Sequence, residues 1–478
     1  MGTNVNFGTY TPPKENKPIP VLKKFLVHFR RPADYQGEYG FDWLRDEYVY
    51  PIVTVAYNNN RAPLGIATPL CNNVNNLKQE YQKDVKNPIR PYGKEYYSAW
   101  LSIFPHTTTK QFAHGSQMHA DGVDLDLEVD EIEPLINDAT KLLFESGNPS
   151  HLKITPHSLK LSEFISSGQK NKNLGTGGNR KYYSLQKKVN IKCEGGVLNN
   201  HEEIKVFAEL GTQKVEVGKL MVYRNDSIPK MNIIMVNVVT SNNSPSAIQS
   251  QRIKTYEYDF KQAGFNQAII RSEVNVYNNF DINSLPSADS DVIYFKQTFI
   301  QNPQFLSNPP TDASGRTIDS TGLFLSTLIK LYNKFGKFKP VHGIDANDNK
   351  RTFLFFTEMN GGGIRGTTDC TNGSVHRVFS WGNAYAIFKD GLINRRAILH
   401  EAGHSMGLQH TFSRGDPSHG LSSPPHTFYQ GYTDNIMDYT WQVVSYSPNP
   451  FDSKDHMRAF YKWQWDIIRQ DRSLIFNY

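Results

Sequence analysis

Hydrophobic and polar positions alternate along much of the first half of the chain, as they do in strands that bury one face. Turn-forming residues separate these runs, and the spacing between them is typical of a β-sandwich. The runs lie at residues 25–29, 100–104, 123–132, 188–193, 204–210 and 215–223. The pattern therefore predicts an all-β region over residues 21–228, with a possible division near residue 95.

The pattern changes after a turn-rich segment at residues 225–229, where we expect a domain boundary. Beyond it strands and helices alternate, and a short strand precedes a helix that begins near Ile393. The predicted strands cover residues 233–239, 268–277, 352–357 and 384–388, and the predicted helices cover residues 246–263 and 323–335. The last of these strands is expected at the edge of a mixed, twisted sheet.

A final helix is predicted from four positions at helical spacing, which should form one buried face: Met457, Tyr461, Gln464 and Ile468. Residues 229–478 are thus expected to form an α+β domain. Since 478 residues exceed the usual single core, the chain should be multidomain. The first region is interpreted as one or two immunoglobulin-like sandwiches with an accessory role.

Two acidic segments raise the question of a calcium site. Residues 123–130 alternate apolar and acidic side chains, which favours a half-buried strand with a solvated acidic face over calcium ligands. Residues 345–349 resemble the start of a calcium loop, but Lys350 stands where such a loop needs glycine, so a hairpin turn is favoured. Calcium therefore stays possible but unsupported.

Composition and charge exclude several classes of protein. Hydrophobic residues make up 38% of the chain and charged residues 21%, and no apolar run is long enough to span a membrane. The net charge of +6 is small, and no long basic block with interleaved aromatics is present. We therefore expect no membrane span and no nucleic-acid partner.

The first twenty residues lack the apolar core of a secretory signal peptide and are rich in Pro and Asn. Residues 1–20 are interpreted as a flexible leader. We expect secretion by a route independent of a signal peptide, with an intracellular location as the alternative.

Eleven residues from His400 to His410, HEAGHSMGLQH, carry the spacing HExxHxxGxxH. His400 and His404 are four residues apart, so they project from one helix face within reach of a single ion. A continuous helix would carry His410 about 15 Å along the axis, so the chain must turn back before it. We expect the turn at Gly407, because glycine tolerates the left-handed backbone that ends helices.

Three neutral imidazoles leave one position of a tetrahedral zinc ion open for water, as in a catalytic rather than a structural site. No cysteine lies near the motif. Glu401 lies beside the histidines, where a carboxylate can take a proton from metal-bound water and pass it to a leaving amine. The spacing predicts one catalytic zinc ion, held by His400, His404 and His410, with Glu401 as the base.

The motif resembles the zinc-binding signature of the metzincin metallopeptidases, and residues 435–439, NIMDY, are similar to their Met-turn. The resemblance implies that Met437 lies as a hydrophobic floor beneath the metal. It also implies that Tyr439 binds zinc or stabilises the oxyanion, with a packed aromatic as the alternative. Thr411 and Phe412, after the third histidine, look most like the pappalysin group.

Other candidate ligands carry weaker signals. His419 and His426 lie in a polar, Gly/Pro-rich loop and are interpreted as solvated loop residues. The three cysteines, Cys71, Cys193 and Cys370, are far apart, so we expect buried free thiols rather than a disulfide framework.

These observations predict a zinc-dependent endopeptidase that acts on protein or peptide substrates, with the β-rich region used for recognition or delivery. One alternative is a toxin-like effector of a contractile injection system, whose N-terminal region contacts the secretion apparatus. The aromatic-rich segment 35–48 is faintly similar to the front segments of such cargo, although core aromatics are the favoured interpretation. Another alternative is an adhesion protein with an inactive protease domain, against which the intact Glu401 argues.

Overall fold

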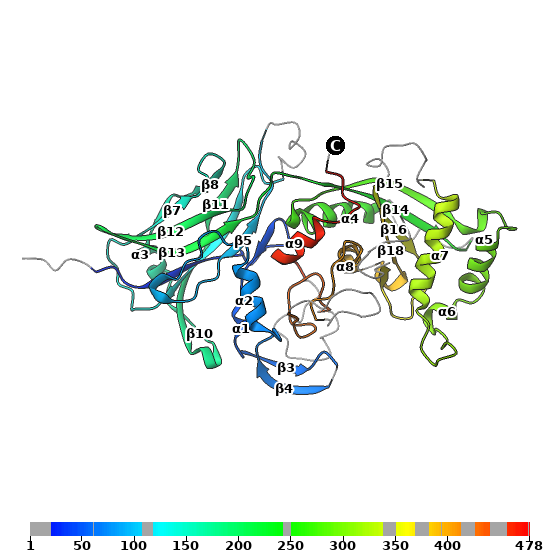
Figure 1. Cartoon of the computed structure of the whole chain (residues 1–478), viewed down its shortest axis with the longest axis horizontal. Helices are drawn as coiled ribbons and strands as arrows, with labels where there is room; N and C mark the ends of the chain where they lie inside the picture. The colour runs from blue at the N-terminus through cyan, green and yellow to red at the C-terminus, as the bar shows by residue number, and fades with distance from the viewer. Residues whose placement is uncertain are drawn as a thin grey trace, which may run out of the picture.

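The computed structural model describes residues 21–60, 62–107, 118–241, 250–337, 350–368, 382–392, 394–412, 426–439, 457–476 and 478. The predicted leader at residues 1–20 and the segment 345–349 lie outside these ranges, as do Cys370 and His419. Figure 1 shows an elongated molecule, with β-sheets of the first half at one end and a helix-covered sheet at the other. The protein is mixed α/β with substantial sheets.

Two sheets of the first half enclose one buried hydrophobic cluster, to which both contribute side chains. One sheet holds, in order, β1 (Phe25–Arg30), β6 (Val123–Glu131), β11 (Asn179–Cys193) and β10 (Lys170–Asn173), with β8 (Leu152–Thr155) also paired to β11. The other holds β2 (Gly40–Asp42), β5 (Ala99–Ser102), β13 (Gln213–Val222), β12 (Glu202–Leu210), β7 (Lys141–Ser146) and β9 (Ser158–Lys160). All six predicted strands are confirmed.

Short elements connect these strands. The hairpin of β3 (Val53–Tyr57) and β4 (Pro63–Thr68) extends away from the sheets, beside α1 (Asp46–Val49) and α2 (Val74–Gln82) (Figure 1). A third short helix, α3 (Leu161–Ser166), follows β9.

The acidic face of β6 differs from the prediction. Leu125, Leu127 and Val129 are buried as the alternation requires, but Glu128 and Asp130 on the other face are only 8% and 9% exposed. Arg30 and Arg180 pair with Glu128 at 3.1 and 3.0 Å, and His28 lies 3.3 Å from Asp130. The prediction of a solvated acidic face was therefore wrong for these two residues, because side chains from neighbouring strands pair with them and cover them. Their partners also leave no reason to invoke calcium there.

The second half of the chain contains a third sheet. Its order is β15 (Arg271–Asp281), β14 (Lys230–Val239), β16 (Arg351–Thr357), β18 (Gly382–Ile387) and β17 (Gly366–Thr368). The first four strands are parallel and β17 runs antiparallel to β18, so the sheet is mixed as predicted. The chain passes into this sheet across residues 223–229, the predicted turn-rich segment.

Helices cover both faces of this sheet (Figure 1). Alternate residues of β16 explain why: Leu354 and Phe356 join one hydrophobic cluster, whereas Phe353 and Phe355 join another. One cluster includes side chains of α4 (Ser250–Gln262), α8 (Arg395–Ser405) and α9 (Lys462–Ile468). The other includes side chains of α5 (Ser290–Phe295), α6 (Gln304–Ser307) and α7 (Ser320–Phe335).

Two element predictions in this half were wrong. The strand near residues 384–388 is not at the edge: β18 lies inside the sheet and β17 forms its edge. A three-residue strand carries too few positions to show alternation, so the pattern did not reveal β17. The final helix begins only at Lys462, and although Met457, Tyr461, Gln464 and Ile468 are all buried, the first two precede it.

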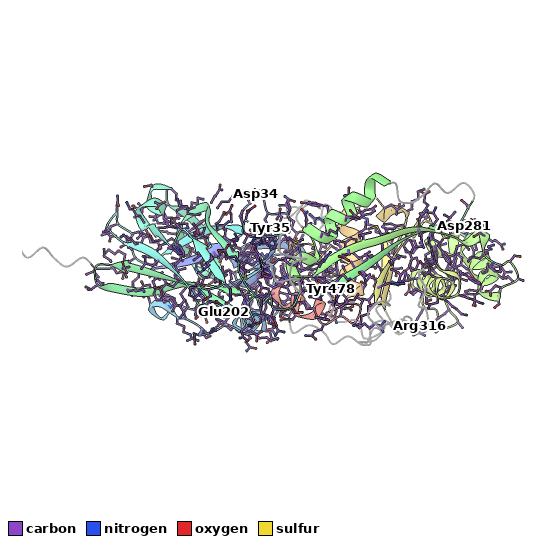
Figure 2. The ribbon with its side chains drawn as sticks, turned by 90° about the horizontal axis from the view of Figure 1, so that it is seen from above. Asp34, Tyr35, Glu202, Asp281, Arg316 and Tyr478 are labelled. Atoms are coloured by element: carbon purple, nitrogen blue, oxygen red, sulfur yellow. The ribbon has the colours of Figure 1, made fainter. Side chains whose placement is uncertain are left out.

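The two halves of the chain also share a core. Tyr48, Leu70, Cys71 and other residues of the first half pack with a group from the second half, namely Phe428, Tyr432, Ala459 and Tyr461. Figure 2 shows Tyr35 in this junction, where Arg458 donates a hydrogen bond of 2.8 Å to its carbonyl. Most aromatic residues of segment 35–48 are buried, which confirms their interpretation as core. Cys71 and Cys193 are buried free thiols as expected.

Among the described residues, no helix combines the length and apolar character needed to cross a bilayer.

Candidate metal centre

The helix α8 presents the candidate ligands on a well-defined backbone. The side chain of Asn394 caps its N-terminus by accepting hydrogen bonds from the backbone N–H groups of Arg396 and Ala397. Gly407 has a φ of +89°, the left-handed conformation expected of it, and directly follows Met406, the C-cap of the helix. The backbone N–H of Leu408 returns to the carbonyl of Gly403 at 3.0 Å, which directs the following residues back towards the helix.

This reversal brings the three predicted ligands together. The Nε2 atoms of His400, His404 and His410 lie 3.0 to 3.1 Å from one another. Ligand atoms bound to one tetrahedral ion at about 2.0–2.1 Å lie about 3.3–3.4 Å apart, so the observed triangle is close to what zinc requires. The group is one that a metal ion fits.

Hydrogen bonds at the opposite ring nitrogens support this interpretation. His400 Nδ1 lies 2.8 Å from the carbonyl oxygen of Ile436, and His404 Nδ1 lies 2.7 Å from that of Leu408. A carbonyl only accepts, so each Nδ1 carries the proton and each Nε2 presents a lone pair to the centre. Burial and the neighbouring imidazoles also lower the pKa values of His400 and His410, which keeps them neutral. Converging lone pairs repel one another unless a cation lies between them.

The Met-turn segment lies directly beneath this helix. Met437 is fully buried, and a Cβ added to Gly403 would come within 2.5 Å of its sulfur. Gly403 is therefore needed for the close approach of the two segments, which the sequence pattern did not indicate. Asp438 fixes the turn by accepting hydrogen bonds from the backbone of Gly431, Thr433 and Tyr439.

The ring of Tyr439 contacts the histidine cluster. Its centroid lies 5.1 Å from that of His400 and 4.6 Å from that of His410, and burial raises its pKa. Phe412 stacks on His410, with ring planes 14° apart and centroids 4.8 Å apart, and its ring centroid lies 4.9 Å from that of Tyr439. These contacts place the ring of Tyr439 beside the histidine cluster, and its role as a ligand or oxyanion donor stays a prediction.

Glu401 lies between α8 and the edge strand β17. The hydroxyl of Thr368 lies 2.7 Å from Glu401 Oε2 and donates to it, and a Cβ added to Gly366 would come within 2.5 Å of Glu401 Cγ. Burial raises the pKa of Glu401 to about 7, and the hydrogen bond from Thr368 opposes part of that shift. Neither Thr368 nor Gly366 was predicted from the sequence, because contacts between distant segments, 33 residues apart for Thr368 and Glu401, leave no local pattern.

Two arginines from the first half contact Asp434, the residue that directly precedes segment 435–439. Buried Asp434 accepts from Arg31 at 2.6 Å and from Arg45 at 3.0 Å. These two cations hold the pKa of Asp434 well below its usual range despite its burial. Two residues later lies Ile436, whose carbonyl orients His400. The first half therefore supports a candidate metal ligand through one short segment.

His426 differs from its prediction as a solvated loop residue. It is only 4% exposed and lies edge-on against Trp463, with ring centroids 4.7 Å apart. Within the described part of the chain neither ring nitrogen has a hydrogen-bond partner, and burial lowers its pKa to about 4. His426 is therefore a packed aromatic side chain. It does not belong to the cluster of the three candidate ligands.

The sequence matches no protein-family model and no curated protein in the comparisons made with them.

Proposed function

We propose that the chain is a zinc-dependent endopeptidase. The observation that carries the proposal is the triangle of Nε2 atoms from His400, His404 and His410 beside the buried carboxylate of Glu401. Three neutral nitrogen ligands with a free fourth position and an adjacent base are the requirements of hydrolytic zinc chemistry.

When bound, zinc would polarise the scissile carbonyl and lower the pKa of a bound water towards about 7. Glu401 takes the proton of the attacking water and delivers it to the nitrogen of the leaving amine. Thr368 orients the carboxylate for both transfers through its 2.7 Å hydrogen bond. Tyr439, packed against two of the ligands, is the residue best placed to stabilise the oxyanion.

The edge strand β17 offers a place for the substrate. It pairs on one side with β18, and its Thr368 contacts the proposed base. An extended peptide that adds to the other side of β17, where no described strand pairs, would be held by main-chain hydrogen bonds whatever its sequence. The proposed substrate is therefore a protein segment in extended form.

The wider assignments follow from the same residues. We place the chain among metzincin-type peptidases, closest in appearance to pappalysin-like members, on the basis of the spacing from His400 to His410 and of the Met437 turn. The paired sheets of the first half serve recognition or delivery in this proposal and are assigned an immunoglobulin-like architecture.

Metal removal tests the proposal. The purified full-length chain should contain about one zinc ion per molecule and cleave a mixed peptide library. A chelator should remove both the zinc and the cleavage, and added zinc should restore both, as followed by elemental analysis and mass spectrometry of the peptides. A chain that binds no zinc, or that cleaves equally well without it, would exclude this function.

Gly366→Ala tests the contact between β17 and the proposed base. The added Cβ would overlap Glu401 Cγ, so the carboxylate must move while the three ligands keep their places. We expect kcat/KM to fall about 10- to 100-fold with the zinc content unchanged. Thr367→Ala, on the same strand but with its side chain on the other face, is the control and should retain activity. Equal effects of the two variants would contradict the assignment.

A further inference from the structure

A cavity of about 500 Å³ lies next to the candidate metal centre. One side is formed by the turn of the β3–β4 hairpin and by Asn72, and the other by Phe412 and residues 427–429. The hairpin comes from the first half of the chain and the opposite wall from the second half. The cavity therefore exists only where the two halves meet.

The wall formed by Phe412 is shared with the metal centre. One face of this ring stacks on His410, a proposed ligand, and the ring also lines the cavity. Asn59 locks the wall to the hairpin: its Nδ2 donates to the carbonyls of Phe412 and Phe428 at 2.9 and 3.0 Å. The backbone N–H of Gln430 donates to Asn59 Oδ1 at 2.9 Å, so the distance from hairpin to metal centre is fixed.

Two other asparagines present hydrogen-bond donors to the cavity. Asn58 Oδ1 accepts from the backbone N–H groups of Asn60 and Ala62, and Asn72 Oδ1 accepts from that of Thr427. These bonds identify the oxygen end of each amide and leave the NH₂ group, which only donates. Within the described ranges neither NH₂ group has a partner.

Among the described residues, the lining contains no carboxylate, ammonium or guanidinium group. A charged side chain would find no counter-ion among these residues. A purely apolar side chain would accept no hydrogen bond from the two NH₂ groups. The chemistry that fits has an aliphatic stem and a neutral hydrogen-bond acceptor at its end.

We propose that this cavity, formed by Asn58, Asn60, Asn72 and Phe412, is a substrate subsite that selects an uncharged amide side chain, glutamine above all. The proposal rests on the proposed function and adds the substrate class to it. A peptide held along the metal centre would place a residue near its cleavage site into the subsite, one aromatic ring beyond His410. Specificity is then set by the first half of the chain.

The double variant Asn58→Asp/Asn72→Asp tests the subsite with little change of shape. Each aspartate keeps an oxygen to accept the same backbone N–H groups and replaces the NH₂ donor by a carboxylate oxygen. The probe is a peptide library in which one position at a time, on either side of the cleaved bond, is varied. Wild type should prefer Gln over Lys by about tenfold at one position, and the variant should prefer Lys or Arg there by a similar factor.

Two further variants guard against misinterpretation. Asn173→Asp makes the same change in a remote turn, where Asn173 Oδ1 accepts from the Gly175 N–H at 2.8 Å, and should leave the profile unchanged. Leu64→Trp fills the cavity and should abolish the Gln preference while the zinc content stays the same. A wild-type profile without any preference for amide side chains, or an unchanged profile in the double variant, overturns the subsite but not the peptidase.

A binding measurement separates the two proposals. Two inactive proteins are compared by calorimetric titration: Glu401→Gln, and the triple variant that adds Asn58→Asp/Asn72→Asp to it. Each is titrated with pairs of peptides that carry either Gln or Lys at one varied position. At the position where the Gln and Lys peptides differ most in affinity, Glu401→Gln should bind the Gln peptide more tightly. The triple variant should bind the Lys peptide more tightly. If wild type cleaves nothing, the peptidase fails, and the subsite then stands or falls with this exchange of preference.

Discussion

Replacing Glu401 by Gln should abolish most peptide cleavage while zinc stays bound. The glutamine has the same shape, and its amide oxygen still accepts the hydrogen bond of Thr368, so neither the helix nor the three ligands need to move. What is lost is the group that takes and returns a proton. A general base contributes about 10²–10⁴-fold, and we expect kcat to fall within that range with little change in KM.

The measurement combines zinc analysis with steady-state kinetics on a single cleaved peptide. Glu163→Gln is the matched control, because this half-buried carboxylate pairs with Lys188 far from the helix α8 and should leave both readouts unchanged. A Glu401→Gln protein that cleaves at the wild-type rate would rule out the assigned base. A protein that has lost its zinc would instead show that the carboxylate is part of the metal site.

Much of the candidate site was predictable because its information is local. The spacing of His400 and His404 depends only on the helical repeat, and the return of His410 depends on one glycine that reverses the chain within a few residues. The strands of the first half were predictable for a similar reason, since a strand with one buried face repeats every two residues.

The missing parts are contacts between distant segments. Thr368 reaches Glu401 from a strand too short to show a pattern, and Arg45 meets Asp434 across 389 residues. His426 was misjudged for the same reason: its segment is polar in sequence, but Trp463 from beyond the Met-turn covers it. The identity of β17 as the edge likewise depends on the order of the strands, which local alternation does not encode.

Contacts between distant segments nonetheless support the proposed metal centre. Arg31 and Arg45 belong to a region that the sequence suggests is accessory, yet they neutralise the carboxylate that precedes the Met-turn. From Asp434 the chain reaches Ile436, whose carbonyl fixes the tautomer of His400. The first half is therefore a structural support of the proposed metal centre, and its removal should cost metal affinity as well as stability.

Arg45→Met should strongly destabilise the folded chain. Arg45 is 3% exposed and pairs with Asp42 and Asp434, so its removal leaves buried carboxylates without one of their cations. Breaking a buried pair in this way costs about 3–5 kcal/mol. The exposed pair of Arg316 with Asp312 lies at the far end of the molecule (Figure 2) and gives the control, Arg316→Met, for which we expect less than about 1 kcal/mol.

Urea unfolding at several pH values identifies Asp434 as the group through which Arg45 acts. Its pKa is depressed in the folded chain, so the pair stabilises the protein above the unfolded pKa of about 4 and loses that contribution as pH falls further. The gap between wild type and Arg45→Met should therefore be full at pH 7 and narrow below about pH 4. Competition with a zinc chelator at pH 7 should show weaker zinc binding by Arg45→Met but not by Arg316→Met, because only the former loosens the segment that orients His400. Equal zinc affinity in both variants, with Arg45→Met still destabilised, would limit the arginine to a role in folding.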